Sequence, residues 1–173
     1  MLYFIRHGES VANVRNLFAG QLDNTPLTEA GKRQATAAGQ RIKSSNVRID
    51  LIVTSPLVRA RQTAELIRTA IGLPLEKIIE DTGIAEYDMG DLTSTPRKNI
   101  TSKQLISAPH AEDPIAFMNR VMSVITRLRA RQGNILVVSH AGVGRIIEAN
   151  RQGMPAADFY DLASYPNAEL VKL

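Results

Sequence analysis

Short apolar runs, separated by longer stretches of mixed polarity, are the most regular feature of this chain. Four of them are typical of strands buried inside a sheet. They cover residues 2–5, 50–54, 78–80 and 135–139. A fifth run, residues 169–173, alternates between polar and apolar side chains, so we expect it at a sheet edge.

Helical periodicity fills the stretches between these runs. Helices are predicted over residues 28–44, 57–71, 113–132 and 141–152. The third helix has the clearest end signals, because Asp113 can cap it, Pro114 suits its first turn and Gly133 can end it. Its apolar stripe is predicted to contain Met118, Val121, Met122, Ile125 and Leu128.

Strands that alternate with helices favour an α/β fold, a three-layer sandwich with a mostly parallel central sheet flanked by helices on both faces. A chain of 173 residues has the length of one domain, and no linker or repeat divides it. We therefore expect a single domain over residues 1–173. Residues 88–112 are the least patterned stretch and are predicted to be a binding loop or a disordered one.

Composition excludes several kinds of site. The absence of cysteine excludes a disulfide framework, a thiolate metal site and a cysteine nucleophile. No apolar run is long enough to span a bilayer, and Arg6 interrupts the first run too early for a signal-peptide core. We therefore expect a soluble, cytoplasmic protein without a membrane partner.

The formal net charge of +4 is spread along the sequence instead of forming a basic block. Without such a block, and without an aromatic stacking motif, no nucleic-acid partner is expected. Basic residues of the third helix are interpreted as a solvated face; they are Arg120, Arg127, Arg129 and Arg131.

Two of the three histidines, His7 and His140, come directly after apolar strands, and Arg6 and Arg59 lie near the same strand ends. Because ligands bind at the carboxyl edge of such sheets, we expect these four side chains to converge on one pocket. Arginine forks match phosphate oxygens, and the helix after His140 offers N–H groups that favour anions. The sequence therefore predicts a phosphoryl site, whereas the guanidiniums would oppose a divalent metal ion. The third histidine, His110, is interpreted as a solvated loop group.

Five motifs follow one another along nearly the whole chain. They begin at Arg6 (RHGES-x-x-N), Pro26 (PLT-x-x-G-x-x-QA), Ser55 (SPL-x-RA-x-QT), Glu86 (EYDMG) and Val138 (VSHAG). They resemble the motifs of the histidine phosphatase superfamily, in its phosphoglycerate-mutase-like branch. The resemblance implies an enzyme that transfers a phosphoryl group through a phosphohistidine, with no cofactor and no metal.

The resemblance also implies roles for individual residues. His7 would be the nucleophile that takes up the phosphoryl group. Glu86 would protonate the leaving oxygen and then activate water. Arg6, Arg59 and His140 would bind the phosphoryl oxygens and stabilise their charge.

Three further residues are expected to contact the substrate, namely Asn13, Gly20 and Ala141. The motif around Glu86 is short, so Asp88 and Asp91 stay open as alternative proton donors.

Elementary chemistry supports a histidine nucleophile. The reference pKa of histidine is about 6.5, so a neutral ring is attainable near pH 7, and the neighbouring arginines would lower the pKa of His7 further. A hydrogen bond from its second ring nitrogen to the backbone carbonyl at Gly8 would fix the tautomer. Arg6, Arg59 and, if it is protonated, His140 would supply the positive charge.

The segment after Glu86 departs from the mutases of the family. Residues 91–93 (DLT) replace their Trp-Glu-Gly-like stretch, and the segment between Glu86 and Pro114 is short and only mildly basic. A mutase must hold its intermediate while it reorients, whereas a phosphatase only needs to admit water. The short segment therefore favours hydrolysis, and we expect a phosphatase that acts on a small-molecule phosphomonoester. A phosphoglycerate mutase and a non-catalytic phospho-ligand binding domain stay open as alternatives. The sequence identifies neither the ester nor the oligomeric state.

Overall fold

The computed structural model of the protein describes residues 1–21, 25–98 and 100–173. Within these ranges five strands form one sheet in the order β3-β2-β4-β1-β5. The strands are β1 (Leu2–Arg6), β2 (Leu51–Thr54), β3 (Ile78–Glu80), β4 (Ile135–Ser139) and β5 (Leu170–Lys172). The first four pair in parallel, and β5 runs antiparallel to β1 at the edge predicted for it.

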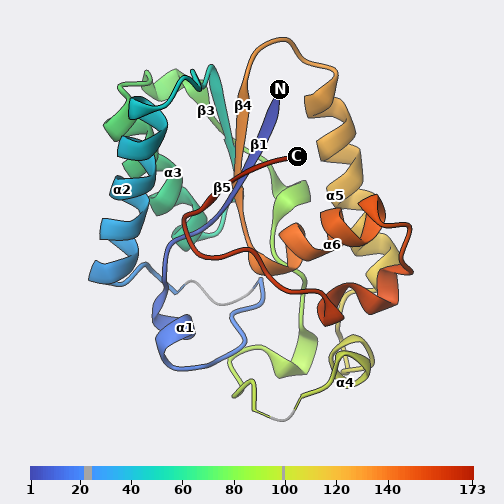
Figure 1. The fold of residues 1–173 in the computed structure, drawn as a ribbon. Helices are drawn as coiled ribbons and strands as arrows, with labels where there is room; N and C mark the ends of the chain where they lie inside the picture. Colours follow the sequence, from blue (N-terminus) through green and yellow to red (C-terminus); the bar gives the residue numbers. More distant parts are fainter. Residues whose placement is uncertain (22–24, 99) are drawn as a thin grey trace.

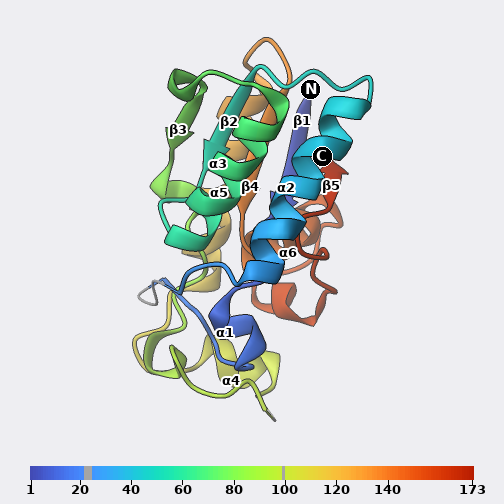
Figure 2. The same ribbon diagram turned by 90° about the vertical axis from the view of Figure 1, so that its left-hand side faces the viewer.

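Helices cover both faces of this sheet (Figure 1). The helices α2 (Glu29–Ser44) and α3 (Val58–Ile71) pack on one face, and α5 (Pro114–Arg129) and α6 (Ala141–Arg151) pack on the other. Two short helices, α1 (Val11–Val14) and α4 (Ser102–Ile106), lie beyond the carboxyl ends of the strands (Figure 2). The predicted three-layer α/β fold is confirmed.

The central strands are continuously apolar because each of their faces is covered. Along β1, Phe4 faces the core beneath α5 and α6, whereas Ile5 faces the core beneath α2 and α3. Val137 and Val138 divide between the same two cores. Since successive strand residues point to opposite faces, a strand with helices on both sides needs apolar side chains at every position.

The register of the strands brings the predicted site residues together. Arg6 is paired with Ser139, and the His7 N–H continues the ladder by donating to the Ser139 carbonyl at 2.8 Å. His7 and His140 therefore leave two neighbouring parallel strands at the same level. In Figure 1 this edge lies at the end of the sheet nearest α1.

The helix over residues 113–132 is shorter than predicted, and its buried face is rotated. It ends at Arg129, where Ala130 forms the cap, and the chain turns at Gly133 with φ +95°. Its buried side chains are Phe117, Val121, Val124, Ile125 and Leu128. Met118 and Met122, which were predicted for this stripe, are only partly buried. Phe117 shifts the face because it packs against Tyr87 and Phe159, with ring centroids 5.2 and 5.3 Å away.

The described part of residues 88–112 has more structure than its sequence pattern indicated. It contains a 3₁₀ turn (Gly90–Leu92) and α4, which begins with a capping box between Thr101 and Gln104. Further 3₁₀ turns cover Leu75–Lys77, Thr82–Ile84 and Ala156–Asp161.

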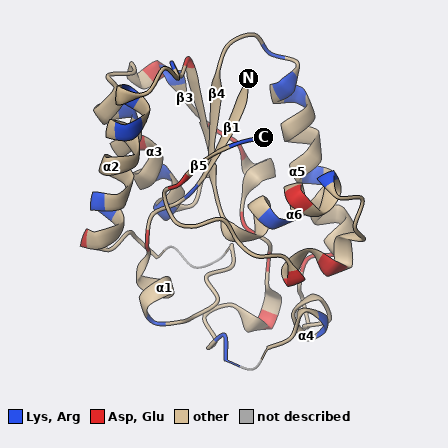
Figure 3. Ribbon diagram, viewed as in Figure 1, with Lys and Arg blue, Asp and Glu red and all other residues tan. Residues whose placement is uncertain are grey.

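Basic positions occur on α2, α4 and α5 (Figure 3), as the scattered charge predicted. In the described ranges, no helix combines the length and the apolar character needed to span a membrane.

Candidate active site

His7 and His140 stand side by side at the carboxyl edge, with ring centroids 5.2 Å apart. His7 Nδ1 lies 2.7 Å from the Gly8 carbonyl oxygen, as expected from the sequence. A carbonyl oxygen only accepts hydrogen bonds, so Nδ1 carries the hydrogen of the neutral ring. His7 Nε2 therefore keeps its lone pair.

Burial keeps the His7 ring neutral. It lowers the pKa of His7 well below the ordinary value of 6.5, and the charges of Arg59 and Arg6 lower it further. The sequence correctly predicted the effect of the arginines, but desolvation is the larger cause. At neutral pH the ring is therefore unprotonated at Nε2 and able to act as a nucleophile.

The guanidiniums of Arg6 and Arg59 lie close to the His7 ring. Arg6 Nη1 donates to Ser164 Oγ at 3.2 Å and to the Tyr165 carbonyl at 3.1 Å, whereas its Nε is buried without a partner in the described structure. Arg59 is 0% exposed, and its Nη2 donates to the Gly20 carbonyl at 3.0 Å. Burial lowers the pKa of Arg6 to about 10, while the nearby Glu86 carboxylate opposes that shift. The charge of Arg59 also lowers the pKa of Arg6, and two desolvated cations that interact in this way favour an anion between them.

His140 is held by one ring nitrogen only. Its Nε2 lies 2.7 Å from Ser55 Oγ, and that oxygen also accepts the Leu57 N–H at 3.3 Å. His140 Nδ1 is buried and has no partner among the described residues. Burial, followed by the charge of Arg59, lowers the pKa of His140 well below 6.5. A protonated His140, which the sequence left open, is therefore disfavoured, and the positive charge of the cluster resides on the arginines.

Glu86 lies against the start of α6 and is only 6% exposed. Its Oε1 accepts the Tyr87 N–H at 2.9 Å, and its Oε2 accepts the Gly142 N–H at 3.2 Å. A Cβ at position 142 would overlap Glu86 Oε1, so a glycine there leaves room for this carboxyl group. The sequence predicted that the N–H groups of this helix end would favour a phosphate. Instead the Gly142 N–H binds a carboxylate of the protein, and Ala141 lines the cavity beside it.

The two alternative acids lie in less suitable surroundings. Asp88 Oδ1 accepts the Gly90 N–H at 3.0 Å and so stabilises a local turn. Asp91 is exposed and pairs with His110 Nδ1 at 2.9 Å, and His110 is itself exposed. Of the three carboxyl groups only Glu86 is buried beside the arginines. The geometry therefore favours Glu86 as the proton donor.

Asn13 and Gly20 have local contacts that the sequence did not indicate. Asn13 Oδ1 accepts the backbone N–H of Ser10 at 3.0 Å and forms the capping box of α1. Gly20 has φ +54°, and its carbonyl accepts the hydrogen bond from Arg59. Through this bond Gly20 orients a guanidinium of the site.

The backbone that carries His7 is fixed by polar groups from distant segments. The Gly8 N–H donates to Thr63 Oγ1 at 3.1 Å, and Asn167 Nδ2 donates to the His7 carbonyl at 2.6 Å. A Cβ on Gly8 would overlap the Gly31 carbonyl oxygen, so this glycine permits a close approach of two segments. Asn167 was missed in the sequence, since nothing near it in the chain indicates a link to His7.

Two further arginines, Arg97 and Arg145, lie beside the cluster and were not assigned to it from the sequence. Both are close enough to Arg6 that their charges lower its pKa. Arg145 is on α6, one turn after Ala141, and this spacing could have revealed it. Arg97 lies in an irregular segment and gives no such signal.

Backbone and aromatic contacts hold both side chains in place. Arg97 Nε donates to the Leu17 carbonyl at 2.8 Å, and Arg145 Nε donates to the Leu162 carbonyl at 2.7 Å. The Arg145 guanidinium lies 4.4 Å over the ring of Tyr160. Arg97, Arg145 and Tyr160 line a small cavity of about 20 Å³ together with Glu86.

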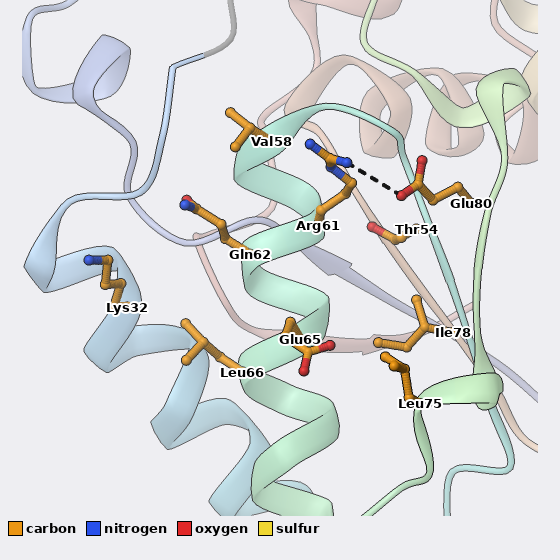
Figure 4. A pocket seen from close by; sticks show the side chains of 10 residues that line it. All are labelled: Lys32, Thr54, Val58, Arg61, Gln62, Glu65, Leu66, Leu75, Ile78 and Glu80. Atoms are coloured by element: carbon orange, nitrogen blue, oxygen red, sulfur yellow. Dashed lines mark ion pairs between the residues drawn. The ribbon is translucent and has the colours of Figure 1, made fainter.

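A much larger groove lies elsewhere, between α3 and β3 (Figure 4). It has a volume of about 610 Å³, an apolar floor that includes Val58, Leu66 and Ile78, and an ion pair of Arg61 and Glu80 at 3.7 Å. None of the site residues predicted from the sequence lines it. The candidate site therefore does not lie in this larger groove. Metal-ligating side chains do not gather in the described structure, where no group of three His, Asp or Glu could hold an ion.

The chain resembles known proteins both in sequence and in structure. The family model described as "Histidine phosphatase superfamily (branch 1)" matches residues 2–173. A 2,3-bisphosphoglycerate-dependent phosphoglycerate mutase of Methylobacterium sp. (strain 4-46) is 44% identical over 93 residues, which are 54% of this chain and 44% of that protein. The mutase of Chelativorans sp. (strain BNC1) is 40% identical over 102 residues, or 59% of this chain and 49% of that protein. The chain thus spans about half the length of the curated relatives it matches.

Solved structures resemble the chain over nearly its whole length. A mycobacterial glucosyl-3-phosphoglycerate phosphatase in complex with VO3 has a TM-score of 0.80 and 26% identity, and the match covers 98% of this chain and 88% of that one. The α-ribazole phosphatase of Shigella flexneri has a TM-score of 0.75 and 30% identity, and the match covers 98% of this chain and 87% of that one.

Proposed function

Because the chain belongs to the histidine phosphatase superfamily, we propose that it hydrolyses a small-molecule phosphomonoester through a phosphohistidine at His7, without a metal or other cofactor. One observation carries the proposal. Among the described residues, a neutral, buried His7 with a free Nε2 lies beside two guanidiniums and the unpartnered Nδ1 of His140. This arrangement suits an anion that is attacked by the imidazole.

In the first step His7 Nε2 attacks phosphorus, and the bond from phosphorus to the ester oxygen breaks. Arg6 and Arg59 stabilise the charge on the phosphoryl oxygens. His140 donates from Nδ1, because the hydroxyl hydrogen of Ser55 can be donated to Nε2. Glu86 gives its proton to the leaving oxygen, so an alcohol departs and a phosphohistidine remains.

In the second step a water molecule attacks the phosphohistidine. Glu86, now a carboxylate, accepts one proton of that water, and the phosphorus–nitrogen bond breaks. Phosphate departs, and His7 and Glu86 return to their starting protonation states. In both steps Asn13 contacts the phosphoryl group through its Nδ2, which has no partner among the described residues.

Arg97 and Arg145 favour a leaving group that carries its own negative charge. They face the cavity beside Glu86, where the alcohol part of the ester would lie. One similar structure is that of a glucosyl-3-phosphoglycerate phosphatase. For this chain we propose an ester whose alcohol part bears a carboxylate or a second phosphate.

A phosphoglycerate mutase is the second candidate, because the curated relatives have that name. Two arginines beside Glu86 could hold a second phosphoryl group. However, a mutase must hold a bisphosphorylated intermediate while that intermediate reorients within the site. The segment between Glu86 and Pro114, which would have to hold that intermediate, is short, and this favours hydrolysis.

The test is turnover of p-nitrophenyl phosphate, glycerol 3-phosphate and 3-phosphoglycerate by the wild type and by His7→Ala. We expect hydrolysis without isomerisation. Turnover of 3-phosphoglycerate should be faster than that of glycerol 3-phosphate, whose alcohol part has no charge. EDTA should have no effect, and vanadate should inhibit. His7→Ala should lose all turnover and the acid-labile phosphoenzyme. His110→Ala is the matched control, since that histidine is exposed and away from the cluster.

The other outcomes would identify the alternatives. Isomerisation of 3-phosphoglycerate would support the mutase. Tight binding of phosphate esters without turnover would support a binding domain. Full activity in His7→Ala would overturn the proposal.

A further inference from the structure

Arg120 on α5 is the residue for which the sequence interpretation was most clearly wrong. It was expected on a solvated face, yet its side chain is only 23% exposed. Its guanidinium donates to both carboxylate oxygens of Glu112, at 2.6 and 2.8 Å. It also donates to the carbonyls of Gly83, Ala85 and Glu86, at 3.0, 2.8 and 2.9 Å. These contacts use all five N–H groups of an arginine.

Glu112 extends the same network to the residues after Glu86. Its Oε2 accepts the Asp88 N–H at 3.3 Å, and its own N–H donates to the Asp88 carbonyl at 2.9 Å. The Tyr87 hydroxyl donates to the Glu112 carbonyl. Residues 83–88 are thus fixed from both sides of Glu86, through bonds to their backbone.

Glu86 sits at the centre of this network and needs accurate placement. In the described structure its carboxyl group accepts hydrogen bonds only from the N–H groups of Tyr87 and Gly142, so the position of its backbone decides where its oxygens lie. A general acid must lie within hydrogen-bond reach of the oxygen that it protonates.

From this geometry we propose that the Arg120–Glu112 pair positions Glu86 for proton transfer to the leaving group. The inference rests on the proposed function, in which Glu86 is the acid. Arg120 does not contact the phosphoryl group in this mechanism, so it is a positioning residue. It acts through the carbonyls on either side of Glu86.

The test separates positioning from general stabilisation through the leaving group. We would measure kcat/KM for glycerol 3-phosphate and for p-nitrophenyl phosphate in Arg120→Met, Arg120→Lys and Glu112→Gln. An alkoxide needs protonation, whereas p-nitrophenolate departs without it. Arg120→Met should lose about 10- to 100-fold on the alkyl ester and much less on the aryl ester. Arg120→Lys should recover little, because an ammonium cannot bridge the carboxylate and three carbonyls at once.

A double variant and a matched control complete the design. In a Glu86→Gln background, Arg120→Met should not change the ratio of the kcat/KM values for the two substrates any further. The reason is that both substitutions affect the same proton transfer. Arg127→Met is the control, since Arg127 lies on the same helix and pairs with Asp81 instead. Glu112→Gln and Arg120→Lys keep the test informative if Arg120→Met folds poorly.

Each outcome has a distinct meaning. Equal losses on both substrates, or a further change of the ratio in the double variant, would overturn the positioning role of Arg120. The wild type could form a phosphohistidine while Glu86→Gln lowers kcat/KM equally for both substrates. That result would overturn this inference and the assignment of the acid. A wild type without a phosphohistidine would overturn the proposed function itself.

Discussion

At the scale of single residues, the environment of each histidine decides its chemistry. His7 and His140 are buried beside guanidiniums, and both effects lower their pKa values. His110 is exposed and donates to Asp91, which raises its pKa. His110 is therefore expected to titrate at a higher pH than His7 and His140.

This difference gives a prediction for a titration followed by NMR of ¹⁵N-labelled histidine rings. His110 should gain its proton above pH 6.5, whereas His7 and His140 should stay neutral well below it. In the unfolded chain both buried histidines would be protonated near pH 6.5, so the unfolded state binds more protons below that pH. The free energy of unfolding should therefore decrease as the pH falls below 6.5. Protonation of His7 near pH 6.5 in the folded protein would contradict the assignment of its environment.

Residue identity alone indicated some of these features. The order Arg6, His7, Gly8 after an apolar run was enough to place a histidine at the sheet edge and to predict its bond to the Gly8 carbonyl. The neutral state of His140 was not predictable, because it depends on complete burial. Arg120 was misjudged for a related reason, since its three carbonyl partners lie 34 to 37 positions earlier in the chain.

At the scale of elements, the N-terminus of α6 binds the carboxyl group of Glu86, the proposed acid. The Gly142 N–H holds the Glu86 carboxyl group, and the missing side chain at position 142 leaves room for it. The atom that a Cβ would meet is the end of a flexible side chain. A larger residue at position 142 would therefore displace Glu86 before it displaced the helix.

Gly142→Ala should consequently separate activity from stability. Alanine favours a helix by up to about 1 kcal/mol over glycine, so the midpoint of thermal unfolding should be unchanged or higher. The displaced carboxyl group should lower kcat/KM for an alkyl phosphate by about 10- to 100-fold. Activity and melting temperature would be measured on the same samples, with Glu86→Gln as the reference for a lost acid. A variant with full activity on the alkyl ester would show that the bond from Gly142 is unimportant.

Element positions followed well from the sequence wherever an element was long or completely buried. Each predicted strand forms, and α2, α3 and α6 begin or end within one residue of expectation. The helices α1 and α4 were missed, because four or five residues give no measurable periodicity. On α5, Val121, Ile125 and Leu128 were predicted correctly for the buried face. Met118 and Met122 were predicted there wrongly, because the contacts of Phe117 with distant aromatic rings help to determine that face.

At the scale of the whole molecule, two apolar cores share one sheet. One core lies beneath α2 and α3 and includes Leu136, and the other lies beneath α5 and α6 and includes Ile125. The same central strands supply side chains to both cores, so neither core can unfold without disrupting the strands that the other core packs against. We propose on this ground that residues 1–173 act as one domain.

The last prediction tests that proposal. Leu136→Ala and Ile125→Ala each remove a fully buried side chain from a different core and should each lower the free energy of unfolding by about 2–5 kcal/mol. If the cores are one cooperative unit, either substitution should weaken both sides of the sheet equally. Hydrogen exchange, followed by mass spectrometry at rising denaturant, would report on peptides from α3 and α5. In each variant the two peptides should lose protection at the same denaturant concentration. Earlier loss from α3 in Leu136→Ala, with α5 still protected, would show that the two cores unfold separately and that the site between them joins two independent units.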